Sequence, residues 1–179
     1  MIRVFCAFAV AVWVGGVSAA DTLYRVELRS VAGDSIEIAQ LSTHADGKYT
    51  ITPNAGAYTD HFLSMRPFKC LEGPDKHWCH VPYPYEIARD ISGDLVDLEY
   101  DFLFLWKAST DYGIDTWNGI YYVLARDGDG MIGQAHEIDL GTLAVPPAAG
   151  ELRPIAAKDL HETDLGSHWL PYLHIVPVR

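Results

Sequence analysis

The sequence predicts an all-β domain, an antiparallel barrel-like or sandwich fold with one short helix at most and one hairpin disulfide. Three observations lead to this prediction. Short segments in which apolar and polar residues alternate recur along the chain, as is typical of strands with one buried face. Turn sequences rich in Gly, Pro, Asn and Asp separate these segments. The segments follow one another as hairpins, which favours the barrel-like sheet but leaves the sandwich open.

The first twenty residues have the layout of a secretory signal peptide. Arg3 precedes an apolar run from Val4 to Val14, and small residues continue to Ala20. A membrane anchor is the alternative, but this run is shorter than the roughly 20 residues that a bilayer span needs. Small residues fit cleavage after Ala20 or after Ala19, and the first is preferred. We therefore expect residues 1–20 to be removed and residues 21–179 to form a single all-β domain. We expect that domain in the periplasm or outside the cell, with no membrane anchor after cleavage.

The first half of the domain contains five strand candidates. Leu23–Ser30 and Ser35–Leu41 alternate in polarity on either side of a turn sequence, which predicts a hairpin. Shorter candidates follow at Lys48–Thr52, His61–Leu71 and His77–Val81. Because turn sequences bound each of them, we expect short connections between neighbouring strands.

Longer strands are predicted in the second half. Leu95–Trp106 alternates over its whole length, which predicts one long strand. Ile120–Asp127 and Met131–Leu140 flank a tight turn, so these three segments predict an antiparallel meander. Leu170–Val178 is expected at an edge of the sheet, because its prolines lack the N–H group that a central ladder uses.

Two short segments favour helix over strand. They are Tyr85–Ile91, which follows two prolines, and Ile155–Thr163. Neither carries a long apolar stripe, so neither is expected to be a large element.

Cys70 and Cys79 are the cysteines that remain after the predicted signal peptide. An even pair in an exported chain favours a disulfide over a metal site or a redox dithiol. Gly73, Pro74 and Asp75 lie between them, so the chain can reverse there and bring the two cysteines together. A loop of this length is expected to stabilise the fold by about 2–3 kcal/mol.

Charge and motif content exclude several classes of function. The formal net charge is -11, which disfavours binding to nucleic acid and to anionic membranes. The sequence also lacks the nucleophile, zinc-protease, phosphate-loop and dinucleotide motifs of common enzymes. No cofactor is predicted, and whether the protein is an enzyme is left open, with binding favoured over catalysis.

The candidate binding residues come mainly from the stretch around the two cysteines. Pro82 and Pro84 hold the backbone extended around Tyr83 and Tyr85, which leaves these rings little conformational entropy to lose on binding a ligand. The full candidate set is Arg66, His80, Tyr83, Tyr85 and Trp117.

A metal site is not predicted in the same stretch. On an extended chain His77 and His80 point to opposite faces, whereas a zinc site needs three or four converging ligands.

Binding of a small molecule or of an envelope protein partner is the function that the sequence favours. The alternative is a metal-dependent hydrolase that uses histidines and acids from loops, such as His61, His77 and His136 with Asp60 or Glu137. A third possibility is a structural or assembly factor of the cell envelope, for which an oligomer at low concentration would be the sign, but nothing in the sequence specifies the oligomeric state.

The first testable prediction concerns processing and oxidation. Protein exported to an oxidising compartment should begin at Asp21 and weigh two hydrogens less than the reduced chain, because Cys70 and Cys79 are bonded. Intact-mass spectrometry with and without a reductant measures both properties. A chain that retains residues 1–20 would contradict the signal peptide, and an unchanged mass on reduction would contradict the disulfide.

Overall fold

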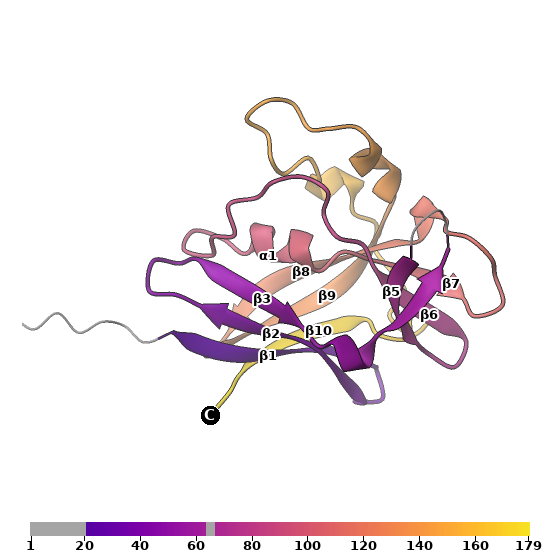
Figure 1. Cartoon of the computed structure of the whole chain (residues 1–179), viewed down its shortest axis with the longest axis horizontal. Coiled ribbons are helices and arrows are strands. Elements are labelled where there is room, and N and C mark those ends of the chain that lie inside the picture. Colours follow the sequence, from indigo (N-terminus) through magenta and orange to yellow (C-terminus); the bar gives the residue numbers. More distant parts are fainter. Residues whose placement is uncertain (1–20, 64–66) are drawn as a thin grey trace, which may run out of the picture.

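The computed structural model describes residues 21–63 and 67–179, and over these residues the chain is nearly all-β (Figure 1). Ten strands form one antiparallel sheet in the order β3-β2-β1-β10-β9-β8-β7-β6-β5-β4. The strands are β1 (Thr22–Arg29), β2 (Ser35–Thr43), β3 (Tyr49–Pro53), β4 (Thr59–Phe62), β5 (Pro67–Glu72), β6 (Lys76–His80), β7 (Phe104–Ala108), β8 (Gly119–Asp127), β9 (Gly130–Ile138) and β10 (Tyr172–Pro177). The helical elements are the α-helix α1 (Val96–Asp101) and the 3-10 turns η1 (Ala55–Ala57), η2 (Thr116–Asn118), η3 (Leu140–Ala144) and η4 (Ala157–Asp159).

The predicted signal peptide, residues 1–20, lies outside the described residues. Within the part of the chain that the structure describes, no helix is long and apolar enough to cross a membrane.

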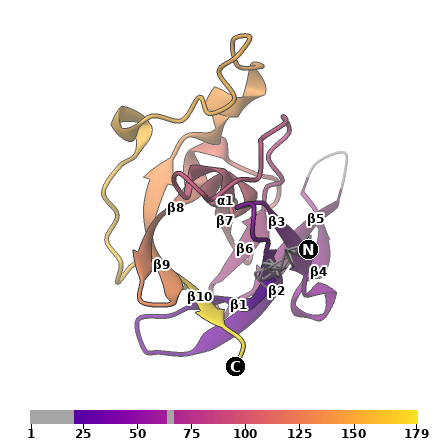
Figure 2. The same ribbon diagram turned by 90° about the vertical axis from the view of Figure 1, so that its left-hand side faces the viewer.

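The sheet curls like a barrel but does not close (Figure 2). Its two edge strands, β3 and β4, follow one another in the chain, and the described residues show no pairing between them. Pro53 ends β3, and the side chain of Asn54 donates to the carbonyl of Glu37 at 2.9 Å while accepting the N–H of Gly56 at 3.3 Å. These bonds turn the chain out of the sheet through η1, so β4 starts beside β5 instead of extending the edge at β3. We call the resulting gap the seam.

The predicted hairpins and the disulfide are confirmed. β1 pairs with β2, and β8 pairs with β9 across a turn in which Gly128 adopts a φ of 55°. β5 and β6 form the third hairpin, which places Cys70 directly opposite Cys79, and the two are joined by a disulfide. The turn residues between the cysteines therefore have the role that the sequence predicts.

The long strand predicted over Leu95–Trp106 is wrong in its first half. Residues 96–101 form helix α1, and only residues from Phe104 onwards join the sheet as β7. The alternation of acids with apolar residues resembles a strand with a solvated face, but Asp97 and Glu99 are buried with the apolar side chains. Asp94 accepts the N–H of Val96 at 3.0 Å, which supports the start of the helix.

The structure differs from the sequence prediction at four other segments. Residues 85–91 contain no helix, and Ile155–Thr163 contains only the short η4 turn. The segment His61–Leu71 is not one strand, because β4 and β5 fold back and pair with each other. β10 is central and not an edge strand: it lies between β1 and β9. Its prolines do not interrupt the ladder, because Pro171 precedes the strand and Pro177 is its last residue.

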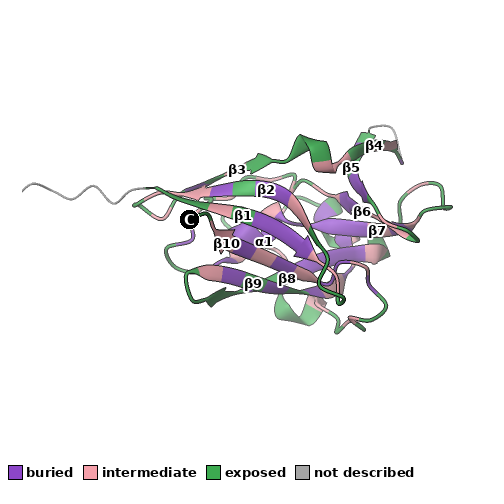
Figure 3. Cartoon of the chain, turned by 90° about the horizontal axis from the view of Figure 1, so that it is seen from below, coloured by how far each residue is buried: buried purple, intermediate pink, exposed green. Residues whose placement is uncertain are grey.

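Apolar side chains form two clusters, and adjacent strand residues such as Trp78 and Cys79 belong to different clusters because they point to opposite faces of the sheet. Figure 3 shows how far each part of the chain is buried. The larger cluster fills the inside of the curl and includes Leu41, Trp78, Tyr122 and Leu173. The smaller cluster lies outside β5 to β8, contains the disulfide, and is covered by the segment that runs from η3 to η4. Helix α1 joins the two clusters, since its Leu98 belongs to the first and its Tyr100 to the second.

Glu99 generates the second prediction, which concerns pH and stability. The Tyr121 hydroxyl donates to its carboxylate, and the Leu124 N–H donates to it at 2.7 Å. Burial raises the pKa of Glu99 above its ordinary value of 4.5. The folded state therefore holds this proton more firmly than the unfolded state. The resulting stabilisation is fully present below pH 4.5 and is lost as the pH rises through the folded-state pKa.

Glu99→Gln should remove that dependence, because an amide keeps an acceptor for Leu124 and has no proton to lose. Urea unfolding between pH 4.5 and 7.5 should show wild type losing stability relative to the variant as the pH rises. The matched control is Glu151→Gln at an exposed glutamate, whose difference from wild type should stay constant. A constant difference for Glu99→Gln as well would contradict the prediction.

Candidate functional site

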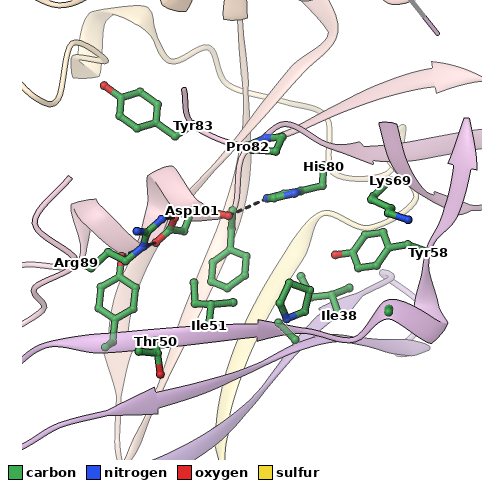
Figure 4. A pocket seen from close by; sticks show the side chains of 15 residues that line it. Ile38, Thr50, Ile51, Tyr58, Lys69, His80, Pro82, Tyr83, Arg89 and Asp101 are labelled. Carbon is green, nitrogen blue, oxygen red and sulfur yellow. Dashed lines mark hydrogen bonds and ion pairs between the residues drawn. The ribbon is translucent and has the colours of Figure 1, made fainter. Parts of the chain in front are cut away.

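A cavity of about 530 Å³ lies at the seam (Figure 4). Its walls come from the inner side of β2 and β3, from η1, from β5 and β6, and from the chain around α1. The lining residues are Ile38, Ala39, Tyr49, Thr50, Ile51, Pro53, Ala55, Tyr58, Lys69, His80, Pro82, Tyr83, Arg89, Asp101 and Phe102. Most of these side chains are apolar or aromatic, and the polar ones are few.

The carboxylate of Asp101 organises one wall of the cavity. Arg89 donates to it through two nitrogens, at 3.0 and 2.9 Å, and the Tyr49 hydroxyl donates at 2.8 Å. Burial and the Asp101 charge raise the pKa of Tyr49 above its ordinary value, so the Tyr49 hydroxyl stays a proton donor. The charge of Asp101 is therefore balanced within the protein.

Arg89 adopts a backbone conformation that is uncommon for its type, with a φ of 50°. Its carbonyl accepts a hydrogen bond from the N–H of Tyr49 at 3.2 Å, while its guanidinium donates to the carboxylate of Asp101. The two contacts hold the loop before α1 against the beginning of β3. This loop therefore covers the start of the free edge, and the seam opens beyond it.

The rest of the β3 edge faces the seam. Backbone groups on an antiparallel strand point alternately to its two sides. Because the N–H of Tyr49 points away from β2 towards Arg89, the N–H and C=O of Ile51 point the same way. Among the described residues they have no backbone partner on that side.

His80 reaches the cavity from the end of β6. Its Nε2 lies 3.0 Å from the main-chain oxygen of Asp101 (Figure 4). Since a carbonyl oxygen accepts, Nε2 must carry the proton, which leaves Nδ1 as an acceptor in the neutral ring. Burial lowers the pKa of His80 below 6.5, so the ring is neutral at pH 7.

Tyr58 and Lys69 complete the polar lining on the opposite side. The Tyr58 hydroxyl points towards the middle of the cavity in Figure 4 and makes no hydrogen bond with the described residues. Burial raises the pKa of Tyr58, so its hydroxyl is protonated at neutral pH. The ammonium of Lys69 lies 2.7 Å from the carboxylate of Asp60.

The structure brings two of the five predicted binding residues to this cavity. They are His80 and Tyr83. Tyr85 does not line it, because its ring lies against Tyr83 and its hydroxyl donates to the carbonyl of Leu143 at 3.0 Å. Trp117 lies in η2 with 70% of its surface exposed, and Arg66 lies outside the described residues.

Sequence reasoning missed the residues that shape the other walls. Asp101 stood in a segment predicted as strand and Arg89 in one predicted as helix, so neither could be placed. Tyr49 lies in the strand candidate Lys48–Thr52 and Tyr58 lies between that candidate and His61–Leu71, and an aromatic residue in either place is too common to single out. These four residues have no common sequence pattern, and they share only a position in the lining of the seam cavity.

The structure brings two residues of the hydrolase alternative, His61 and His77, together. The His61 ring lies 4.7 Å from the His77 ring and 3.0 Å from the carboxylate of Glu72. Glu137 lies on a different strand, β9, and its carboxylate is 2.9 Å from Nε2 of His168. In residues 21–63 and 67–179, no group of three or more His, Cys, Asp or Glu side chains is placed to hold a metal ion.

A second hollow, of about 620 Å³, lies over the ends of β9 and β10. Its lining is more polar than that of the seam cavity and includes Arg25, Asp127, Asp129 and the terminal Arg179. The seam cavity therefore offers the better enclosed apolar surface for a ligand.

The Arg89–Asp101 pair generates the third prediction. Arg89→Gln should destabilise the fold by about 1 kcal/mol, since it removes the charged donor from a carboxylate that is only 11% exposed. Asp101→Asn should lower the free energy of unfolding by less. Arg89 is 55% exposed, so water can hydrate its guanidinium, and the amide oxygen of Asn can still accept from Tyr49. The double variant should therefore be more stable than the sum of the two single changes implies.

Urea unfolding of the four proteins measures this coupling. These four proteins form a double-mutant cycle. Position 89 carries a non-glycine residue in all of them, so any cost of its positive φ is the same throughout and cancels from the coupling energy. A coupling of zero would show that the ion pair does not hold this wall of the cavity.

Comparison with known proteins identifies no relative. No protein-family model matches the chain, and no curated protein and no solved structure matches it either. Function therefore has to follow from the geometry of the seam cavity.

Proposed function

We propose that this protein is an exported domain that binds a small, largely apolar molecule in the seam cavity. The observation that carries the proposal is the cavity itself. Its volume of about 530 Å³ falls within the roughly 300–1,000 Å³ of small-molecule sites. Like such sites, it combines apolar walls with a few polar groups that converge on one space.

The way the cavity is built supports the proposal. Two edge strands that do not pair leave the opening, and the Arg89–Asp101–Tyr49 contacts fix the wall beside it. A site formed before the ligand arrives requires little reorganisation on binding, which favours affinity.

Export is part of the same proposal. The layout of residues 1–20 predicts a signal peptide, and the Cys70–Cys79 disulfide is typical of proteins in oxidising compartments. A periplasmic or secreted location follows from the two together.

The alternatives remain predictions from the sequence. None of the histidines and acids named for the hydrolase alternative lines the seam cavity. Binding of an envelope protein partner is compatible with the free edge of β3, but the enclosed apolar walls favour a small molecule.

The fourth prediction tests the site by filling its mouth. Ala55 is exposed in η1 and lines the cavity, so Ala55→Trp places an indole at the opening without disturbing the core. Nile red, an uncharged apolar dye whose emission increases in apolar surroundings, should bind wild type at one site per chain. Ala55→Trp should weaken its binding at least tenfold in a fluorescence titration.

Ala144→Trp is the matched control, because Ala144 is also an exposed alanine in a 3-10 turn but does not line the cavity. Its dissociation constant for the dye should stay within twofold of wild type. Equal weakening in both variants, or saturable binding that neither variant affects, would place the dye elsewhere and contradict the proposed site.

A further inference from the structure

We infer that the ligand of the seam cavity is an uncharged apolar molecule that carries a hydroxyl or carboxamide group, held between the Tyr58 hydroxyl and His80 Nδ1. The inference rests on the proposed function and adds the chemical class of the ligand. It depends on which polar groups of the cavity already have partners and which do not.

The charged groups of the cavity are already paired. Asp101 is bonded to Arg89 and Tyr49, and Lys69 pairs with Asp60 outside the cavity. Because each cation already faces a carboxylate, an anionic ligand gains less at Lys69 or Arg89 than it would at an unpaired cation, and a cationic ligand would have to compete with Arg89 for Asp101. The cavity therefore favours a ligand without net charge.

One unpaired side-chain group is an acceptor. His80 donates through Nε2 to the carbonyl of Asp101, which fixes the tautomer and leaves the Nδ1 lone pair free. No described residue forms a hydrogen bond with Nδ1, and Nδ1 is not fully buried. Nδ1 can therefore accept a hydrogen bond from a molecule in the cavity.

A second unpaired group, on a residue less exposed than Thr50, can donate a hydrogen bond. The Tyr58 hydroxyl lines the same cavity, has no hydrogen bond within the described residues, and is directed inwards (Figure 4). A ligand atom that accepts from Tyr58 would satisfy it.

A donor and an acceptor in one cavity select a particular kind of ligand group. A hydroxyl or a carboxamide can accept from Tyr58 and donate to His80 at the same time. A carboxylate can only accept, so it would direct negative charge at the Nδ1 lone pair. An unsubstituted hydrocarbon would leave both protein groups without partners, a loss that polar sites use to discriminate between ligands.

The fifth prediction compares three naphthalene derivatives of nearly the same shape. Equilibrium dialysis at pH 7 against naphthalene, 2-naphthol and 2-naphthoate measures the effect of a neutral hydroxyl and of a carboxylate on one apolar body. 2-Naphthol should bind wild type roughly five- to tenfold tighter than naphthalene, as one or two net hydrogen bonds allow. 2-Naphthoate should bind more weakly than 2-naphthol.

Two variants assign the preference to the two residues. Tyr58→Phe removes the donor, and His80→Phe removes the Nδ1 acceptor together with the Nε2 hydrogen bond to the carbonyl of Asp101, so its folding is checked by thermal unfolding. Each should bring the dissociation constant of 2-naphthol to within about twofold of that of naphthalene. The matched control is Tyr172→Phe, a half-buried tyrosine outside the cavity, which should keep the full preference.

The outcomes separate the inference from the proposed function. Equal binding of naphthalene and 2-naphthol, or tightest binding of 2-naphthoate, would overturn the hydroxyl inference and leave the apolar site in place. A preference for 2-naphthol that survives both cavity variants would also overturn the inference. If none of the three compounds binds, and Nile red does not bind either, the proposed function itself fails.

Discussion

The structure depends on the acidic helix α1 being buried with a partner for each of its charges. Asp97 bonds to Arg153 at 2.7 Å, Glu99 to Tyr121 and Leu124, and Asp101 to Arg89 and Tyr49. Unpaired carboxylates cannot be buried in an apolar interior without a large penalty. The partners come from β3, from β8, from the loop before α1 and from the segment between η3 and η4, so these contacts tie distant segments of the chain to one short helix.

The seam is a consequence of this arrangement. Asp101 holds Arg89, and Arg89 holds the beginning of β3, so the loop before α1 occupies the edge where another strand would otherwise continue the sheet. Pro53 and Asn54 then turn the chain away from the edge and into β4 on the far side. The curl stays open at one place, and Asp101 and its partners Arg89 and Tyr49 line the opening.

Charge pairing also determines the chemistry of the cavity. Because Asp101 and Lys69 are paired with protein groups, the half-buried neutral side chains of Tyr58 and His80 are available to orient a ligand. The apolar walls can then act on the body of a ligand while two neutral groups orient it. A net charge of -11 over the chain does not imply a charged binding site, since the local pairs and not the total decide the field in the cavity.

The sequence by itself determined the fold class, most strand positions and the disulfide, because alternating polarity, turn residues and a short cysteine spacing are local signals. The prediction failed at Leu95–Trp106, because its acids are buried and paired with residues distant in the chain. It also failed at β10, which is central because both of its edges pair with other strands. It placed His80 and Tyr83 among the candidate residues, but not Tyr49, Tyr58, Arg89 or Asp101. Only the tertiary structure decided that these residues share one cavity, because strand order and the open seam are set by contacts between distant segments, to which no local pattern points.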